Sequence, residues 1–410
     1  MPRRLEVSDP ALVFAGGGVV VVAVAWATGT PEVAAVGALV ALTALLLSCW
    51  GRWSLAGVRY SRTLGQRRAL FGEHVTMEVE LVNDKLLPLT WVHVEEEVPP
   101  HLPIEGGTVG AEGWRTELRF VVPMRPYQRV RRRLTVVAAQ RGEHTFGPTT
   151  IRSGSPLGTH ERSVEIRNQT SLLVYPKVFA LSAPLVPSSV PIGEHRARRS
   201  LAVDPTRVLG VRPYQTGDPT RHIDWRATAR SADLLVRVHE PATSLGTAVF
   251  VDLAPPPNSK LREATDIVEL TVAVAASVVS HLLADGIPTG LYLNGTAFGR
   301  LVASPPSSSA QALPALLDTL ARVTGFGGGP IDAVLARQQS RLRAGVSVLV
   351  VSAHFPAATV VAVAGTRRPT SAMWIATERG APPPTGLFDH RWEVPYGDDW
   401  RDRTVLDLGS

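Results

Sequence analysis

Cysteine is almost absent from this chain, and its scarcity excludes whole classes of site. The single thiol is Cys49, so neither a disulfide framework nor a metal site built on clustered cysteines can form. Lysine is nearly as scarce, occurring only at Lys85, Lys177 and Lys260, so the net charge of +6 rests on arginine. Nucleic-acid binding needs a clustered basic face with interleaved aromatics or a known module. We find neither, and we expect no nucleic-acid partner.

Charged residues are missing from two stretches near the N-terminus, residues 11–28 and 33–50. Each approaches the ~20 apolar residues that a helix needs to cross the hydrocarbon of a bilayer. The link between them, residues 29–32, allows only a tight hairpin, so both ends of the pair lie on one side. Arginines flank the pair, whereas the link carries only Glu32. Because positive residues stay cytoplasmic, we predict a multi-pass plasma (inner) membrane protein with both termini in the cytoplasm.

Tryptophans flank these apolar stretches at Trp26, Trp50 and Trp53. We place them at the membrane interface, where amphipathic rings favour the headgroups, so the lipid bilayer is the first predicted partner. Three alternatives are weaker. A cleaved signal peptide would have only one apolar core, whereas this chain has two. Residues 46–49 resemble a lipoprotein cleavage box, but they lie too deep in the chain. A soluble helical hairpin would need a polar face, which neither stretch has. We therefore predict a transmembrane hairpin over residues 1–53.

Polar and apolar residues alternate along much of residues 54–176, for example over 75–81 and 90–95. Such alternation indicates half-buried antiparallel strands, separated here by turn-forming pairs of Gly, Pro, Asn and Asp. Many short strands at this spacing predict a β-sandwich-like domain. The most basic run, residues 129–133, would place alternate arginines on one strand face, and we interpret it as a solvated face near anionic lipid.

Residues 204–240 carry the densest signal in the chain. A turn ends at Asp218, which can cap a short helix running to about residue 231 because Pro219 suits its first position. Residues 234–238 then read as a strand. Four arginines lie close to Asp218 and Asp224 in the sequence, so an arginine–carboxylate network is expected. Those arginines are Arg212, Arg221, Arg226 and Arg230.

From Arg212 to Arg230 the sequence reads R-P-Y-Q-T-G-D-P-T-R-H-I-D-W-R-A-T-A-R. This string closely resembles the signature of the family catalogued as domain of unknown function 58, a bacterial family. Upstream motifs resemble the family's approach to that signature in the same order, namely Arg141-Gly142, Phe146-Gly147-Pro148, Ser155-Pro156-Leu157-Gly158 and Val174-Tyr175-Pro176. Members usually show Asp-Pro-Phe-Gly at the third of these. The resemblance covers essentially the whole chain.

The resemblance implies partners rather than a reaction. Such proteins look like companions of MoxR-type AAA ATPases, and often of von Willebrand factor A-domain proteins, in the assembly or maturation of envelope or metal-containing complexes. No catalytic residues are established for the family, so none is carried over. We interpret the signature segment as a structural brace or a docking surface rather than a catalytic site. Its arginines would repel a metal cation, and no histidine pair has the spacing of metal ligands. The candidate partner-binding residues are Arg212, Tyr214, Gly217, Asp218, Arg221, Asp224, Trp225 and Arg230.

Strand and helix patterns alternate over residues 246–380, which predicts an α/β domain with a mostly parallel sheet. Asn294-Gly295 is expected to turn a hairpin. The region resembles von Willebrand A domains, whose metal-adhesion motif Asp-x-Ser-x-Ser begins where the first strand ends. Here that position is Asp252, and both serines are missing. Since a hard cation needs several oxygen ligands, we predict an A-domain-like fold with a degenerate motif, no functional metal and no cofactor.

These features predict a non-enzymatic, membrane-anchored interaction or adaptor protein. No nucleophile–base pair, phosphate loop or dinucleotide fingerprint appears in the sequence. Two alternatives stay open: an enzyme of unrecognised type using Asp218, Asp224 and Asp252, and an extracytoplasmic adhesion module, which would need reversed topology. Residues 177–245 are expected to be a linker with the signature. Residues 381–410 form a tail, either packed on the α/β domain or available for recognition.

Overall fold

The protein is described here by a computed structural model. It covers residues 10–112, 115–158, 160–182, 185, 203–215, 223–231, 233–241, 246–297, 299–324, 329–397 and 399–409. The chain divides into two compact units, Met1–Tyr175 and Pro176–Ser410, and each is described by itself.

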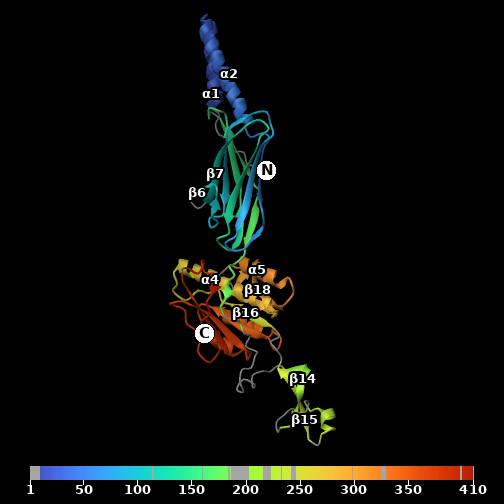
Figure 1. Ribbon diagram of the computed structural model, residues 1–410. Helices are drawn as coiled ribbons and strands as arrows, with labels where there is room; N and C mark the ends of the chain where they lie inside the picture. The colour runs from blue at the N-terminus through green and yellow to red at the C-terminus, as the bar shows by residue number, and fades with distance from the viewer. Residues whose placement is uncertain are drawn as a thin grey trace. The chain divides into compact units, whose positions relative to one another are not determined.

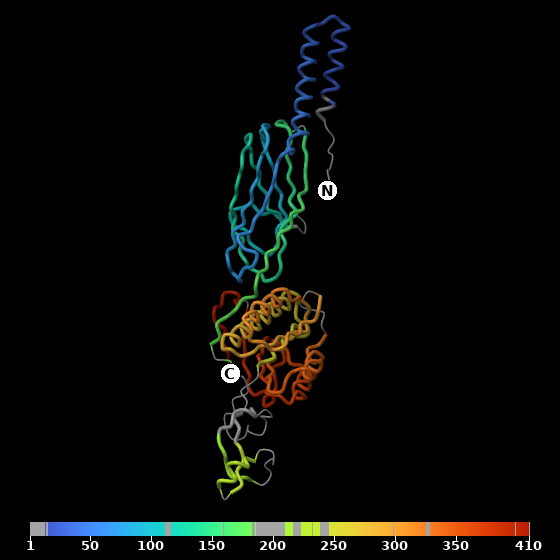
Figure 2. The backbone as a smooth tube through the Cα atoms, turned by 90° about the vertical axis from the view of Figure 1, so that its right-hand side faces the viewer, coloured from blue at the N-terminus to red at the C-terminus, as the bar shows by residue number. Residues whose placement is uncertain are grey.

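Two apolar helices, α1 (Pro10–Ala27) and α2 (Pro31–Trp53), form a hairpin in the first unit (Figures 1 and 2). Small residues let the helices approach closely, since a Cβ on Gly37 would lie 2.9 Å from the side chain of Val21. Most of their large apolar side chains stay exposed. Helix α2 is long and apolar enough to cross a membrane, and α1 contributes a shorter apolar stretch, Ala15–Ala27. Two apolar helices near the N-terminus agree with the sequence prediction of a membrane hairpin.

Three sheets follow in the first unit, and all their strand pairs are antiparallel except β2 with β12. The first sheet runs in the order β1 (Val58–Leu64), β3 (His74–Asn83), β8 (Arg129–Val137) and β5 (Ile104–Glu105). The second runs in the order β11 (Glu161–Ile166), β10 (Thr149–Gly154), β4 (Leu89–Val98), β7 (Arg115–Met124) and β6 (Thr108–Glu112). A small third sheet holds β2 (Arg68–Ala69), β12 (Thr170–Val174) and β9 (Gly142–Phe146). Because β3 and β4 bury alternate side chains in one shared hydrophobic core, the predicted period of two is confirmed here.

A charged network lies inside this core. Arg62 on β1 donates to one carboxylate oxygen of Glu96 on β4, and the hydroxyl of Tyr60 donates to the other. Arg62 also donates to the carbonyl oxygens of Phe146 and Asn168. Removing one partner of such a buried pair costs about 3–5 kcal/mol, because the other charge is left uncompensated. The network thus ties two sheets to the Phe146-Gly147-Pro148 motif.

The arginine run of β8 pairs across the sheet with glutamates of β3. Arg129 Nε lies 2.8 Å from Glu80 Oε1, and Arg131 Nε lies 3.5 Å from Glu78 Oε1. Opposite charges on neighbouring strands stabilise a sheet modestly. These arginines are exposed, as a solvated face requires, but the neighbouring strand offsets their charge.

The second unit contains a six-stranded sheet that confirms the mostly parallel arrangement. Its order is β18 (Arg300–Ser307), β17 (Thr289–Ala297), β16 (Thr247–Val251), β19 (Ser347–Ser352), β20 (Thr370–Ala376) and β21 (His390–Pro395). Only the β17–β18 pair is antiparallel. The strand order reverses between β16 and β19, the two central strands.

Helices cover both faces of this sheet (Figure 1). They are α4 (Leu261–Ala284), α5 (Ala312–Arg322), α6 (Ile331–Gln339) and α7 (Ala357–Ala364). Val249 and Val251 of β16 pack in one core cluster with α4 and α5, whereas Phe250 packs in a second cluster with α6 and α7. Although α4 is long and apolar enough to cross a membrane, 72% of its apolar window is buried, so it is the core helix of this unit.

In this unit the structure changes one expectation from the sequence and decides between two alternatives for another. Asn294-Gly295 does not turn the hairpin, because both residues lie inside β17 and the turn comes after Ala297, at Gly299 with φ +69°. A Cβ at position 295 would lie 2.6 Å from Leu253 Cδ1, so glycine serves close packing there. The C-terminal residues are packed on the domain. They supply β21 to the sheet, and β22 (Val405–Leu406) pairs with β13 (Ala180–Leu181).

Candidate functional site

The described part of the signature segment forms a hairpin with a short helix. Strand β14 (Val203–Pro213) pairs antiparallel with β15 (Leu235–Pro241), and α3 (Trp225–Thr228) lies between them in sequence. A bridge joins Ile223 to Val236, and both side chains are buried. Residues 216–222 lie outside the described residues, and with them Gly217, Asp218, Arg221 and the predicted cap at Asp218.

Asp224 caps the helix of the described signature. Its Oδ1 accepts from the backbone N–H groups of Arg226 at 3.0 Å and Ala227 at 3.1 Å. Its Oδ2 accepts from Arg237 Nε at 2.9 Å, and this hydrogen bond, with the backbone donors, holds the pKa of Asp224 below its usual range. The expected carboxylate–arginine contact therefore exists at Asp224. Its partner is Arg237 of β15, which the sequence reasoning missed because the two residues meet only across the hairpin.

The same helix presents an aromatic side chain to solvent. Trp225 is 67% exposed although it directly follows Asp224, the residue that caps the helix. Arg226 and Arg230 are also exposed, while Arg212 is half-buried and donates to the carbonyl of Pro213 at 3.0 Å. Tyr214 lies at the end of β14, where its N–H donates to Leu234 O at 2.8 Å. The described signature thus combines a local brace with an accessible indole and cations.

A second candidate site surrounds Asp252, where β16 ends and the strand order of the sheet reverses. Open α/β sheets bind ligands outside this point. Asp252 is buried there, and its Oδ1 accepts from Asn294 Nδ2 at 2.7 Å and from Ala254 N at 3.0 Å. Its Oδ2 lies 3.1 Å from Ser352 Oγ. Burial raises the pKa of Asp252, against the opposing effect of these donors.

The position of the Ser352 proton bears on this carboxyl group. Ser352 Oγ also lies 2.7 Å from His354 O, and it accepts from His354 N at 3.0 Å. A hydroxyl has one proton to donate. When it donates to His354 O, the contact with Asp252 requires a proton on the carboxyl group, which agrees with the direction of the pKa shift. Asp252 is engaged by protein donors, and no cluster of three or more His, Cys, Asp or Glu suited to a metal occurs among the described residues.

Asp224 and Asp252 depend on different elements. The partners of Asp224 come from α3 and β15, whereas those of Asp252 come from β17, β19 and the loop after β16. Asp218 lies outside the described residues. Within the described part of the chain, Asp224 and Asp252 therefore share no hydrogen-bond partner.

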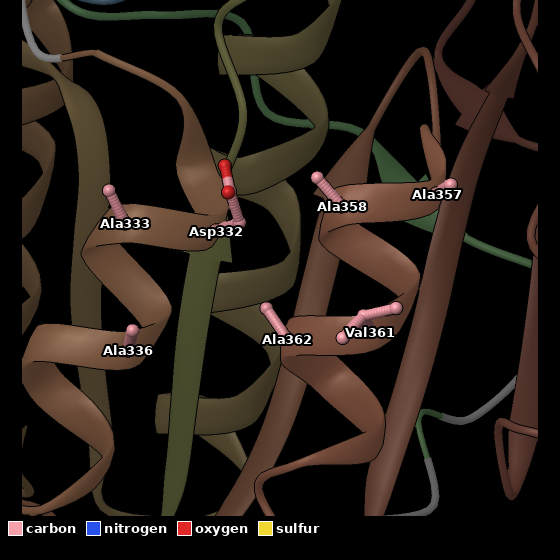
Figure 3. A pocket seen from close by; sticks show the side chains of 7 residues that line it. All are labelled: Asp332, Ala333, Ala336, Ala357, Ala358, Val361 and Ala362. Carbon is pink, nitrogen blue, oxygen red and sulfur yellow. The ribbon is translucent and has the colours of Figure 1, made fainter.

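An open groove of about 480 Å³ lies between α6 and α7 (Figure 3). Small side chains dominate it, and the lining residues are Asp332, Ala333, Ala336, Ala357, Ala358, Val361 and Ala362. Asp332 is the one ionisable group in this lining, and a single carboxylate without a partner acid or base gives no reaction.

The predicted interface tryptophans lie toward the two ends of the helical hairpin. Trp26 is in the last turn of α1, next to the link, and its indole is exposed. Trp50 and Trp53 are in the last turn of α2, and Trp53 is exposed. Because a helix rises 1.5 Å per residue, the 23 residues of α2 span about 34 Å, enough to separate these two levels by the ~30 Å thickness of the hydrocarbon core.

Comparison with known proteins supports the resemblance drawn from the signature. Residues 210–379 match the model of a family described as protein of unknown function DUF58. A curated relative, "Uncharacterized protein YeaD" of Bacillus subtilis (strain 168), is 26% identical over 251 residues, which are 58% of this chain and 56% of the relative. The chain thus spans about half the length of that relative.

Solved structures match a smaller part of the chain. A cohesin module from a Clostridium perfringens ATCC13124 family 33 glycoside hydrolase has 10% identity and a TM-score of 0.20, covering 28% of this chain and 96% of that module. The sporulation control protein Spo0M of Bacillus subtilis has 11% identity and a TM-score of 0.17, covering 29% of this chain and 49% of that one. Likenesses this weak carry no argument about this chain.

Proposed function

Because residues 210–379 of the chain belong to the DUF58 family, we propose that the protein is a non-enzymatic, membrane-anchored interaction or adaptor protein. Its proposed partner is a MoxR-type AAA ATPase, with von Willebrand A-domain proteins as further candidates. The proposed role is assembly or maturation of envelope or other complexes. The observation that carries the proposal is the exposed indole of Trp225 on a braced hairpin.

The proposed anchor is the α1–α2 hairpin, with both termini in the cytoplasm. Exposed apolar side chains along both helices support it, as do the tryptophans toward the two ends. Arg52 follows the apolar part of α2, whereas the link carries Glu32, and this asymmetry favours the cytoplasmic orientation.

The proposed α/β unit is A-domain-like but works without a metal. When the strands β16 to β21 are numbered 1 to 6 along the chain, the sheet has the order 3-2-1-4-5-6, and its edge strand β18 is antiparallel. This arrangement supports an A-domain-like fold. The contacts of Asp252 support a metal-free site, because Asn294 and Ala254 donate to the oxygen that a cation would need. Such a unit would serve as a binding scaffold.

The docking surface proposed on this unit centres on Trp225. Tryptophan and arginine are enriched among residues whose truncation costs most at interfaces. The Asp224–Arg237 pair fixes the start of α3, so the indole is presented without a large loss of backbone entropy on binding. Arg226 and Arg230 lie on the exposed surface of the same turn and suit an acidic partner surface.

A pull-down of the full-length chain from solubilised membranes tests this surface. We expect Trp225→Ser to lower recovery of a MoxR-type ATPase, with an affinity loss of about 30-fold, since central tryptophans contribute about 2 kcal/mol or more. Leu261→Ser is the matched control, because Leu261 is 83% exposed elsewhere in the same unit. Equal recovery with both variants would remove Trp225 from the interface. Unfolding of Asp224→Asn would show that the pair with Arg237 is a brace.

A further inference from the structure

Three loops of the first unit gather around the residues that follow α2. The β3–β4 loop holds Lys85, whose ammonium group donates to the carbonyl oxygens of Trp53, Ser54 and Ala56. The β7–β8 loop joins it, since the N–H of Tyr127 donates to Lys85 O at 3.2 Å.

The β10–β11 region completes this end of the sheets. Ser54 Oγ lies 2.8 Å from Gly51 O and 3.3 Å from Ser153 O, and Arg162 donates to Arg52 O. A Cβ on Gly51 would collide with the His160 ring at 2.1 Å, so the end of α2 sits directly on this region. Both tube and ribbon views show the helical hairpin leaving the sheets at this end (Figures 1 and 2).

Each of the three loops exposes one large apolar side chain. Leu86 is 73% exposed, and Tyr127 and Leu157 are each 70% exposed. We call these three residues the apolar tip. Exposed apolar side chains on the loops beside a helix that enters lipid have a natural partner in the bilayer interface, where tyrosine in particular keeps its ring in apolar surroundings and its hydroxyl in water.

The backbone at Tyr127 strengthens this interpretation. Its φ is +54°, a left-handed conformation that glycine or asparagine adopts readily and a bulky side chain does not. Strained residues of this kind persist where the surroundings hold them and often serve a function. Here the residue in the left-handed conformation is an exposed tyrosine on the β7–β8 loop.

Cations at the same end suit a negatively charged lipid surface. Arg52 ends the apolar helix, Arg125 lies on the β7–β8 loop, and both side chains are exposed. Arg59, also exposed, is the second residue of β1 and pairs with Asp84. Basic residues within a Debye length of an anionic leaflet are attracted to it.

We propose that the apolar tip inserts into the interfacial layer of the bilayer that α2 enters, holding the β-sheet domain against anionic lipid headgroups. The inference rests on the membrane anchoring of the proposed function and goes beyond it, because a hairpin anchor alone does not require the domain to touch lipid. The level of the tip follows from Lys85, which bonds to the carbonyls of Trp53 and the residues just after it.

Depth-dependent quenching on the full-length chain tests the inference. Three single-cysteine variants, Leu157→Cys, Leu70→Cys and Leu46→Cys, each in a Cys49→Ala background, are labelled with bimane. The proteins are reconstituted into phosphatidylcholine–phosphatidylglycerol vesicles with a nitroxide near the headgroup or along the acyl chain. Leu70 is the matched control, because it is exposed but lies before β3, whose ten residues separate it from the tip by about 30 Å. Leu46 on α2 reports membrane insertion.

We expect the headgroup nitroxide to quench the label at residue 157 several-fold more than the label at residue 70, and the acyl-chain nitroxide to quench the label at residue 46. Quenching at 46 but not at 157 would overturn the apolar tip and leave the anchor intact. No quenching at either position would overturn the anchor itself. Adding Leu86→Ser and Tyr127→Ser should reduce quenching at 157, and unchanged quenching there would also count against the tip.

Discussion

Two buried carboxylates in this chain are stabilised in different ways. Glu96 has the cation Arg62 as its partner, whereas Asp252 has neutral donors, chiefly Asn294. Burial raises the pKa of Asp252 above its ordinary value of 3.8, so between the two pKa values this carboxyl group binds more proton in the folded than in the unfolded state. The contribution of this group to stability is therefore complete below the ordinary value. It is lost as the pH rises through the raised pKa.

We expect Asp252→Asn to fold and to gain stability relative to the parent as the pH rises from 3.8 toward neutrality. The new amide keeps an oxygen for Asn294 and Ala254 and donates to Ser352, while the charged form disappears. Hydrogen exchange of the β16 amides in detergent, corrected for intrinsic rates, measures the difference. Asp252→Ala is the contrast, since it leaves Asn294 without its acceptor and costs about 1–3 kcal/mol. Parallel pH profiles for the parent and the Asp252→Asn variant would contradict the expectation, and stoichiometric Mg²⁺ binding that depends on Asp252 would overturn the metal-free proposal.

The join between α2 and the sheets depends on one lysine. Lys85 caps the carbonyl oxygens that follow the helix, a role that cations near helix C-termini commonly take. Burial lowers the pKa of Lys85 to about 8, so most of it is charged at neutral pH. We expect Lys85→Met to cost about 1.5–3 kcal/mol locally, the range for hydrogen bonds to charged groups, and to speed hydrogen exchange over residues 55–58.

Lys177→Met is the matched control for this change. Lys177 also donates to a backbone carbonyl, that of Arg401, but it lies in the second unit. Its loss should leave exchange over residues 55–58 unchanged. Equal exchange in both variants and the parent would show that the α2 end is held by Ser54 and Arg162 instead.

Hydrophobic periodicity predicts most elements of this protein because burial depends on local spacing. The apolar helices, the alternating strands and the buried strand β16 all follow from it. Asn294-Gly295 has the local sequence of a hairpin turn, but its role in the structure depends on residues far away in the chain. Asn294 donates to Asp252, and Gly295 packs closely against Leu253. Strand β21 is not predictable from periodicity, because its residues show no strong period and follow a proline run.

The partners of the candidate site residues escape sequence-based prediction for a related reason. Asp224 was placed correctly among arginines, but its cap role and its partner Arg237 depend on β14 pairing with β15, and strand pairing is not encoded in local spacing. Asn294 and Ser352 become partners of Asp252 only when β17, β16 and β19 lie side by side. Such contacts join residues 42 and 100 positions apart in the chain.

The orientation of the chain in the membrane decides where its partner must be. The arginines beyond α2 and the acidic link favour a cytoplasmic second unit, the compartment in which an ATPase has its nucleotide. We expect protease to digest residues 176–410 in inside-out vesicles and to spare them in right-side-out vesicles. An alkaline phosphatase fused to the C-terminus should be inactive, and a fluorescent protein fused there should fluoresce.

A matched charge variant makes this orientation falsifiable. Glu32→Lys together with Arg52→Ser moves positive charge from the α2 end to the link, so it should raise the protected fraction in inside-out vesicles, whereas Glu32→Gln alone should change it little. Protection of the parent chain in inside-out vesicles, with an active phosphatase, would place the second unit outside the cytoplasm. The adhesion-module alternative would then replace the ATPase partnership, because the exposed Trp225 could reach only extracytoplasmic proteins.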